Sequence, residues 1–213
     1  MIVLAGTIGA GKTSLTKILS AHLDSTGYYE SVDDNEILPL FYKDPKKYAF
    51  LLQIYFLNTR LNNIEKAHNE KLSVMDRSIY EDSLLFRLNA DMKRATSTEA
   101  DIYDSLLENM MEEIPGSLNQ KNPDLLIHIN ISFDTMLKRI KKRGRSYEQV
   151  DKDPELYNYY QDLNSRYNDW YDNYDLSPKM QIDGDKFDFI ENDEDLAAVL
   201  KQIDEKIAEL NLK

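Results

Sequence analysis

Cysteine is missing from this chain of 213 residues, and its absence excludes several kinds of chemistry. Without cysteine there is no disulfide, no thiolate nucleophile and no cysteine-ligated metal. Long apolar runs are missing too, because the best one, residues 49–57, is short and contains Gln53. The first residues carry no basic region ahead of their apolar stretch, which argues against a signal peptide. We therefore expect a cytoplasmic protein that does not interact with membranes.

Basic side chains are scarce relative to acidic ones. The chain has 26 Lys and Arg against 38 Asp and Glu, which gives a formal net charge of -12. An acidic surface repels polynucleotide backbones and anionic membranes, so we expect neither as a partner. A small substrate in a locally basic pocket remains compatible with this charge. The length suits one domain over residues 1–213 with a well-buried core.

Strand-like and helix-like apolar spacings alternate along the chain. They predict strands over residues 1–5, 28–32, 72–75, 124–130 and 179–183. They predict helices over residues 12–23, 47–69, 82–88, 98–111, 133–143, 154–174 and 194–210. The helix over 98–111 is expected to be capped by Thr98 and to end before Pro115 and Gly116. This alternation indicates an α/β fold, a parallel β-sheet flanked by α-helices on both faces.

A glycine-rich segment, GTIGAGKT, lies between the first strand and the first helix. It fits the phosphate-loop pattern G-x-x-x-x-G-K-[ST], in which backbone N–H groups surround phosphate oxygens. Lys12 is expected to bridge the β- and γ-phosphates, and Thr13 to offer its hydroxyl to Mg²⁺. The motif predicts nucleotide binding but does not choose between a kinase, a GTPase switch and a motor. The residues expected to bind the nucleotide are Gly6, Thr7, Ile8, Gly9, Ala10, Gly11, Lys12, Thr13 and Ser14.

Two acids and an arginine are predicted near strand ends, where ligands bind in open α/β sheets. Glu30 lies near the end of the second predicted strand, and Asp76 and Arg77 end the third. Phosphorylation of a hydroxyl needs a carboxylate that takes the proton and cations beside the transferred group. Glu30 or Asp76 can do the first and Arg77 the second. The competing interpretations are a solvated loop acid for Glu30 and a helix cap for Asp76.

A dense basic run, KRIKKRGR, stands out in this acidic chain. Arg139 and Arg143 are four residues apart and share one helical face, and Arg145 follows a glycine. Arginines on such a segment can close over phosphates and exclude water, so we predict an arginine-rich lid over residues 139–148. For Lys141 and Lys142 a solvated helix face is the preferred interpretation.

Two further features lie on predicted helices. Gln53 is an amide among apolar residues, which either faces solvent or reads the edge of a base by donating and accepting together. An aromatic stripe follows the helix over 154–174, and core packing is its preferred interpretation; its members are Tyr160, Tyr167, Trp170, Tyr171 and Tyr174.

Taken together, these segments resemble the deoxynucleoside kinase family along nearly the whole chain, above all the deoxyadenosine/deoxyguanosine kinases of lactobacilli. The resemblance lies in GTIGAGKT, YYESVDDN, LPLFYKDPKKYAFLLQIYFLNTR, MDRSIYED and KRIKKRGRSYEQ, of which MDRSIYED with RGRSYEQ is the most specific. It implies a P-loop kinase fold, ATP as phosphoryl donor, Mg²⁺, and a dimer, either of identical subunits or with a sister subunit.

The resemblance also implies roles for single residues. Glu30 resembles the general base on the 5′-hydroxyl, Asp76 the acid beside Mg²⁺ that has also been assigned as proton acceptor, and Arg77 the contact to the 5′-oxygen and phosphoryl group. Asp76 stands where animal members carry Glu, which leaves the division between the two acids open. The remaining matches are Gln53 as the base-reading amide, Arg60 and Asp82 as the charged pair beside the base, Tyr42 and Glu148 at the sugar 3′-hydroxyl, and the lid arginines Arg139, Arg143 and Arg145.

The predicted function is therefore ATP-dependent phosphorylation of a deoxyribonucleoside in nucleotide salvage. Deoxyadenosine is the first candidate, with deoxyguanosine and deoxycytidine left open. A regulatory GTPase would need a guanine-specifying Asn-Lys-x-Asp segment, which the sequence lacks. A nucleoside monophosphate kinase is the nearest rival, but Gln53, Tyr42 and Glu148 suit an uncharged acceptor better than a phosphate.

Overall fold

The computed structural model describes residues 1–30, 35–67, 70, 72–113, 122–151 and 153–212. Its centre is a parallel sheet with the strand order β2-β3-β1-β4-β5. The two-fold periodicity of β1 is visible in its packing, because alternate residues face opposite layers of helices. The strands are β1 (Ile2–Ala5), β2 (Gly27–Tyr28), β3 (Val74–Asp76), β4 (Leu125–Asn130) and β5 (Lys179–Asp183).

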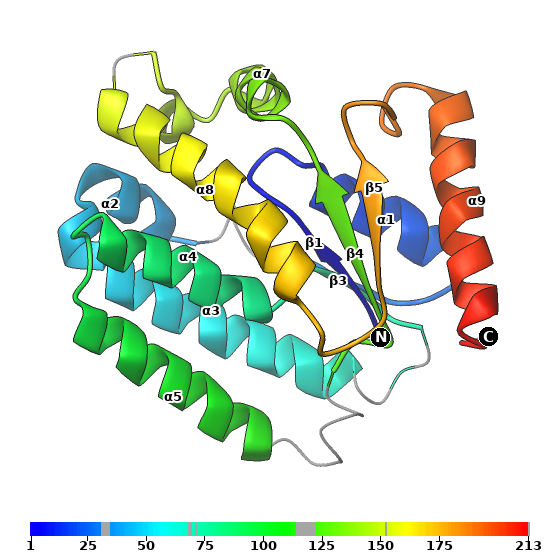
Figure 1. The fold of residues 1–213 in the computed structure, drawn as a ribbon, viewed down its shortest axis with the longest axis horizontal. Coiled ribbons are helices and arrows are strands. Elements are labelled where there is room, and N and C mark those ends of the chain that lie inside the picture. Colours follow the sequence, from blue (N-terminus) through cyan, green and yellow to red (C-terminus); the bar gives the residue numbers. More distant parts are fainter. Residues whose placement is uncertain (31–34, 68–69, 71, 114–121, 152, 213) are drawn as a thin grey trace.

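Helices cover both faces of this sheet (Figure 1). On one side lie α1 and α9, and on the other lie α3, α4, α5 and α8. This arrangement confirms the predicted α/β fold. The helices are α1 (Lys12–His22), α2 (Ile37–Lys43), α3 (Pro45–Ala67), α4 (Tyr80–Asp91), α5 (Ser97–Glu113), α7 (Phe133–Arg143), α8 (Pro154–Asn173) and α9 (Asp193–Glu209), with a 3-10 turn, η1 (Ser146–Glu148).

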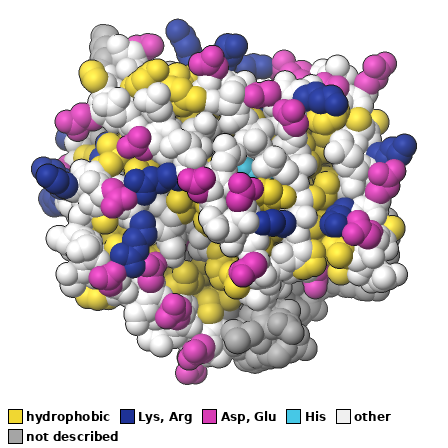
Figure 2. All heavy atoms as spheres, viewed as in Figure 1, with side chains coloured by type: hydrophobic (Ala, Val, Ile, Leu, Met, Phe, Trp, Pro, Cys, Tyr) yellow, Lys and Arg dark blue, Asp and Glu magenta, His cyan; other side chains and the backbone are white. Residues whose placement is uncertain are grey.

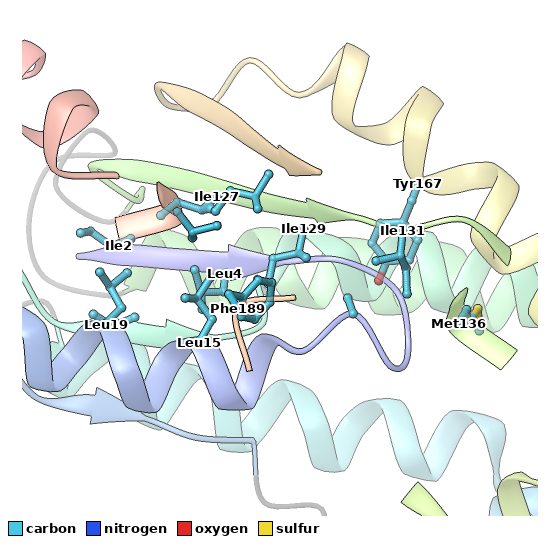
Figure 3. Close-up of a cluster of buried hydrophobic side chains, with 14 of the residues drawn as sticks. Ile2, Leu4, Leu15, Leu19, Ile127, Ile129, Ile131, Met136, Tyr167 and Phe189 are labelled. Atoms are coloured by element: carbon cyan, nitrogen blue, oxygen red, sulfur yellow. The ribbon is translucent and has the colours of Figure 1, made fainter. Parts of the chain in front are cut away.

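Two apolar clusters hold the layers together. Ile2 and Leu4 of β1 belong to the first cluster together with Leu15 and Leu19 of α1 (Figure 3). Val3, the residue between them, belongs to the second cluster, which joins the sheet to α3, α4 and α5. The core is therefore continuous through the sheet, and the strand ends that carry polar residues are fixed from both sides.

The surface carries acidic and basic groups side by side. On the face in Figure 2, Asp and Glu side chains alternate with Lys and Arg across the molecule and do not gather into one patch. No helix in the described part of the chain has the length and apolar character needed to cross a membrane.

The second strand differs from the prediction. It ends at Tyr28, so Glu30 follows the strand and does not lie within it, while residues 31 and 32 of the predicted strand lie outside the described residues. Among the described residues of this segment, Gly27 and Tyr28 are the ones that pair with β3, opposite Val74 and Met75. Glu30 therefore lies in the loop that follows β2, and this loop begins at the carboxyl edge of the sheet.

Helix α2 has no counterpart in the sequence-based prediction. Pro39 speaks against a helix in this segment, but it lies in the first helical turn, where a missing N–H costs nothing. The side chain of Asn35 accepts hydrogen bonds from the backbone N–H groups of Ile37 and Leu38 at 2.9 and 3.0 Å, which satisfies two unpaired donors.

Several other helix boundaries differ from the predicted ones. Helix α3 begins at Pro45, a residue suited to the first helical position, and α4 spans Tyr80–Asp91, beyond the predicted 82–88. The cap of α5 is Thr96, and the predicted Thr98 is wrong. Thr96 and Glu99 exchange hydrogen bonds in a capping box, with the Glu99 N–H 3.1 Å from Thr96 Oγ1. Pro115 and Gly116 lie outside the described residues.

Candidate functional site

One cleft of about 860 Å³ opens at the carboxyl edge of the strands. The phosphate loop, the ends of β2 and β3, helices α2 and α3, and the segment around Arg139–Glu148 all contribute to it. This is the place where open α/β sheets bind ligands. A cleft of this volume can hold a sizeable small molecule. Its walls come from segments that are far apart in the sequence.

The phosphate loop follows β1 and enters α1, as predicted. A side chain at Gly6 would place its Cβ 2.7 Å from the Ile129 carbonyl oxygen, so this position has room only for glycine. Gly11 has φ +99, a conformation that favours glycine. The Lys12 ammonium donates hydrogen bonds to the carbonyl oxygens of Gly6 and Thr7 at 2.7 and 3.0 Å. Burial, reinforced by the nearby Arg77 cation, lowers the pKa of Lys12 to about 8.

Thr13 and Asp76 form the second element of the site. The Thr13 hydroxyl donates a 2.5 Å hydrogen bond to Asp76 Oδ2, while the buried Asp76 Oδ1 has no hydrogen-bond partner among the described residues. Burial raises the pKa of Asp76, although the Lys12 ammonium opposes this shift. A hydroxyl beside a carboxylate oxygen is a fitting donor set for Mg²⁺, which prefers oxygen ligands at one or two carboxylates plus substrate phosphates.

Glu30 lies between two guanidinium groups. Arg60 donates to Glu30 Oε1, and Arg77 Nε lies 3.4 Å from Glu30 Oε2. Only 13% of the Glu30 side chain is exposed, so the interpretation as a solvated loop acid is wrong. Burial raises the pKa of Glu30, but Arg77, Arg60 and Lys12 outweigh it and lower the pKa to about 2. The carboxylate is therefore ionised and firmly held.

Arg77 sits in an unusual backbone conformation at the end of β3. Its φ is +79, and its N–H donates to the Leu4 carbonyl oxygen at 2.9 Å. This turn directs the buried guanidinium toward Glu30 on one side and toward the Tyr167 hydroxyl on the other, at 3.2 Å. Such strain is typical of positions whose side-chain direction matters.

Glu81 also belongs to the site, although it was not predicted from the sequence. The side chain is fully buried and accepts hydrogen bonds from the N–H groups of Gly6 at 3.0 Å and Ser78 at 2.7 Å. It also accepts from the Tyr167 hydroxyl at 2.8 Å and lies 3.7 Å from Arg77. Glu81 thus ties the phosphate loop to the strand end. Its place in the first turn of a helix was the available signal.

A mostly apolar chamber continues the cleft between α3, α4 and α8. Gln53 lines it and is buried, with its Oε1 unpartnered in the described part of the chain. The solvent-facing alternative for Gln53 is therefore wrong. Behind the chamber, Arg60 forms an ion pair with the fully buried Asp82, as the resemblance implied. Burial raises the pKa of Asp82 to about 6, although Arg60 opposes the shift.

Other residues of the chamber come from separate elements and left no pattern in the sequence. Their apolar and aromatic side chains give a flat ligand two faces to pack against. Asn89 is buried there and donates to the Leu85 carbonyl oxygen at 2.8 Å. The additional lining residues are Leu38, Phe41, Leu52, Phe56, Leu85, Asn89 and Tyr159.

Tyr42 and Glu148 meet at the side of the chamber, although 106 positions separate them in the sequence. The Tyr160 hydroxyl lies 3.3 Å from both the Tyr42 hydroxyl and the Glu148 carbonyl oxygen. Burial raises the pKa of Tyr42 well above its usual range, so its hydroxyl keeps its proton. A phenol and a carboxylate together can bind a sugar hydroxyl that both donates and accepts.

The three predicted lid arginines all line the cleft. Arg139 donates to the carbonyl oxygens of Ala10 at 2.9 Å and Gly184 at 2.8 Å, so it contacts the phosphate loop. Arg143 and Arg145 instead pair with Glu148, at 2.5 and 3.5 Å. The segment therefore connects the phosphate loop to the side of the chamber where Tyr42 and Glu148 lie.

A short loop after β5 also lines the cleft and was not predicted. Asp188, Ile190 and Glu191 face the cavity, and Glu191 pairs with the exposed Lys142 across it. Phe189 packs behind the loop, where a side chain at Gly11 would reach its ring at 3.1 Å. The stripe on α8 is mainly core, as predicted, apart from the hydroxyl contacts of Tyr167 and Tyr160 described above.

Known proteins resemble this chain along nearly its whole length. The family model described as deoxynucleoside kinase matches residues 2–208. A deoxyguanosine kinase of Lactobacillus acidophilus is 59% identical over 210 residues, covering 99% of this chain and 92% of that protein. A deoxyadenosine kinase of the same bacterium is 58% identical, covering 99% and 97%. The structure of deoxyadenosine kinase from M. mycoides with bound dATP has a TM-score of 0.77 and 29% identity, covering 95% and 98%.

Proposed function

This chain belongs to the deoxynucleoside kinase family and is a nucleoside kinase, and on that premise we propose that it transfers the γ-phosphoryl group of ATP to the 5′-hydroxyl of deoxyadenosine. The observation that carries the proposal is the position of Glu30. This carboxylate lies in the same cleft as the phosphate loop and the chamber around Gln53. This shared cleft supports a role for Glu30 as proton acceptor, because a nucleoside bound beside Gln53 and a nucleotide bound at the phosphate loop would meet within it.

The reaction then needs five side chains of this chain. The 5′-oxygen of the nucleoside forms a bond to the γ-phosphorus, the bond from that phosphorus to the bridging oxygen of ADP breaks, and the hydroxyl proton passes to Glu30. Arg77 and Lys12 stabilise the negative charge that spreads over the transferred group. Tyr42 and Glu148 orient the sugar, so that the 5′-oxygen faces the phosphoryl group.

Mg²⁺ is the metal that suits the oxygens of Thr13 and Asp76. When bound, it neutralises charge on the β- and γ-phosphates. Asp76 and Thr13 would hold this ion, and Glu30 would then be the proton acceptor. The unpartnered Asp76 Oδ1 supports this division of roles.

The base preference rests on Gln53. Its amide can accept from the exocyclic amino group of adenine and donate to a neighbouring ring nitrogen. One bidentate contact of this kind discriminates by about 1–3 kcal/mol. The relatives named for deoxyadenosine and deoxyguanosine are almost equally similar to this chain, so deoxyguanosine is the nearest competing substrate.

A panel of acceptors tests the proposal directly. The four natural deoxyribonucleosides and their monophosphates are each assayed with Mg-ATP, and the product is identified by mass. We expect deoxyadenosine to give the highest kcat/KM and thymidine the lowest. A preference for monophosphates would overturn the proposal in favour of a nucleoside monophosphate kinase. The carboxylates of Glu30, Asp82 and Glu148 near the chamber argue against such an anionic acceptor.

We also propose a dimer built on α3 and α5, in a cytoplasmic enzyme. Leu51 on α3 and Ile102 on α5 are large apolar residues with 48% and 55% of their surface exposed, and a dimer interface on these helices would remove them from water. Light scattering of the purified chain tests this part. A monomer at micromolar concentration would contradict a homodimer, and a dimer that forms only after a sister subunit is added would favour a heterodimer.

A further inference from the structure

The guanidinium of Arg60 is shared between two carboxylates with different tasks. One terminal nitrogen donates to Asp82 behind the base chamber, and the other donates to Glu30, the proposed proton acceptor. The third nitrogen, Nε, is buried without a hydrogen-bond partner in the described part of the chain. The guanidinium carbon also lies 4.7 Å from the centre of the Phe56 ring. A single buried cation therefore connects the base chamber to the reacting end of the site.

This sharing affects how readily Glu30 can take a proton. The groups that face Glu30 are the cations Arg77, Arg60 and Lys12 and, at longer range, the carboxylates of Asp76 and Asp82. A carboxylate that accepts hydrogen bonds from two guanidinium groups is a weak base. If Arg60 donates elsewhere, Glu30 loses one of its two guanidinium donors and becomes a stronger base.

A nucleobase in the chamber can compete with Glu30 for the terminal nitrogen of Arg60 that now donates to this carboxylate. Arg60 and Gln53 both line the cavity, and the Gln53 Oε1 and Arg60 Nε are unpartnered among the described residues. A purine offers ring nitrogens that accept from Arg60 and an amino group that donates to Gln53. The Nε–H can donate to the base without any loss to the carboxylates, but a terminal nitrogen that turns toward the base withdraws its hydrogen bond from Asp82 or Glu30.

We propose that Arg60 is a positioning residue whose hydrogen bond keeps Glu30 a poor proton acceptor until a nucleobase enters the chamber. Proton acceptance then depends on recognition of the nucleoside. This inference rests on the proposed function. This dependence would keep Glu30 from activating a water molecule for attack on ATP when no nucleoside is bound. In that unwanted reaction the water oxygen bonds to the γ-phosphorus, ADP leaves, and the water proton passes to Glu30.

The unaltered enzyme provides the first test. It is assayed with Mg-ATP and 1,2-dideoxyribose, a sugar that carries the 5-hydroxyl but no base, in the presence and absence of free adenine. We expect adenine to raise phosphorylation of the sugar about tenfold, a fraction of the full general-base contribution. Adenine that inhibits deoxyadenosine phosphorylation competitively, and so occupies the chamber, yet leaves the sugar reaction unchanged would overturn the inference.

Variants decide the matter independently of whether adenine binds alone. Arg60→Gln should phosphorylate deoxyadenosine less well but should phosphorylate the baseless sugar and hydrolyse ATP faster than the unaltered enzyme. The double variant with Glu30→Gln should lose this gain. Arg87→Gln is the matched control, because it removes a half-exposed arginine that pairs with Asp101 and Asp104 on the outside of the molecule, and it should change neither reaction.

Removal of Arg60 leaves Asp82 without its cation, and the variant can fail to fold for that reason. Arg60→Lys is the second variant, because a point charge paired with Asp82 cannot reproduce the fork that also reaches Glu30. It should fold and show the same gain. Equal losses of all three reactions in the folded Arg60 variants would indicate a purely structural role. An unaltered enzyme that phosphorylates no deoxyribonucleoside would overturn the proposed function itself, which is a different outcome from an active enzyme without the gain.

Discussion

Replacement of Glu30 by Gln is the perturbation whose effect can be derived in most detail from the structure. The amide keeps the size and shape of the carboxylate and can still accept a hydrogen bond from Arg60 or Arg77. It cannot take a proton from the 5′-hydroxyl. We expect kcat to fall by about 10²–10⁴-fold, the usual contribution of a general base, while KM for the nucleoside changes far less.

The same substitution has a predictable effect on stability. Two guanidinium groups and Lys12 lower the pKa of Glu30 to about 2, well below that of an ordinary glutamate. A depression of this size corresponds to roughly 3 kcal/mol of stabilisation at neutral pH. Because the folded-state pKa is the lower one, this stabilisation is complete above the unfolded-state pKa and is lost as the pH falls toward 2. The variant should therefore be less stable at pH 7, and the difference should shrink below about pH 4.5.

Single-turnover kinetics separate the two effects. The variant is saturated with nucleoside and Mg-ATP, and its fold is checked by circular dichroism and by chemical unfolding at several pH values. Asp76→Asn is the comparison, because it removes the other acid of the site. If phosphoryl transfer survives in Glu30→Gln and collapses in Asp76→Asn through loss of the proton acceptor, with Mg²⁺ dependence unchanged, the roles given to these two acids are exchanged.

Three further predictions use the same assay. Lys12→Ala should lower kcat/KM by more than about 100-fold, equivalent to roughly 2.7–4 kcal/mol, and a folded variant with near-normal turnover would refute its role at the phosphates. Gln53→Leu should reduce the preference for deoxyadenosine over thymidine by about 1–3 kcal/mol in kcat/KM ratios, and an unchanged ratio would show that the amide does not read the base. Glu81→Gln should leave unsatisfied at least one of the N–H or hydroxyl groups that donate to Glu81, and should lower the free energy of unfolding in urea by about 1–3 kcal/mol. A variant as stable as the parent would contradict the place of Glu81 between Gly6 and Ser78.

The parts of the site that could be predicted are those encoded by neighbouring residues. The phosphate loop is a contiguous motif between a strand and a helix, so its position follows from local sequence. Asp76 is the last residue of a buried strand and Arg77 follows it, which places both at the carboxyl edge of the sheet. The helix α7 was predicted to the residue, because Ser132 caps its start and Gly144 adopts φ +76 at its end.

The parts that could not be predicted depend on contacts between distant segments. Arg60 reaches Glu30 from α3 over a separation of 30 residues, and no local pattern encodes this contact. Its pairing with Asp82, 22 residues away, was implied only by the family resemblance. Glu81 appears in the sequence as an ordinary acid at a helix start, whereas its partners include the N–H of Gly6, 75 residues away. Helix α2 was missed because Pro39 breaks helices in most positions but not in the first turn.

The central claim is that the acceptor is an uncharged nucleoside whose 5′-hydroxyl transfers its proton to Glu30. The most direct measurement is the ratio of kcat/KM for deoxyadenosine to that for its 5′-monophosphate, with Mg-ATP as donor and the products identified by mass. The structure predicts a ratio far above one, with deoxyadenosine 5′-monophosphate and ADP as the products. A ratio below one, or ADP formation that does not depend on the nucleoside, would contradict the claim.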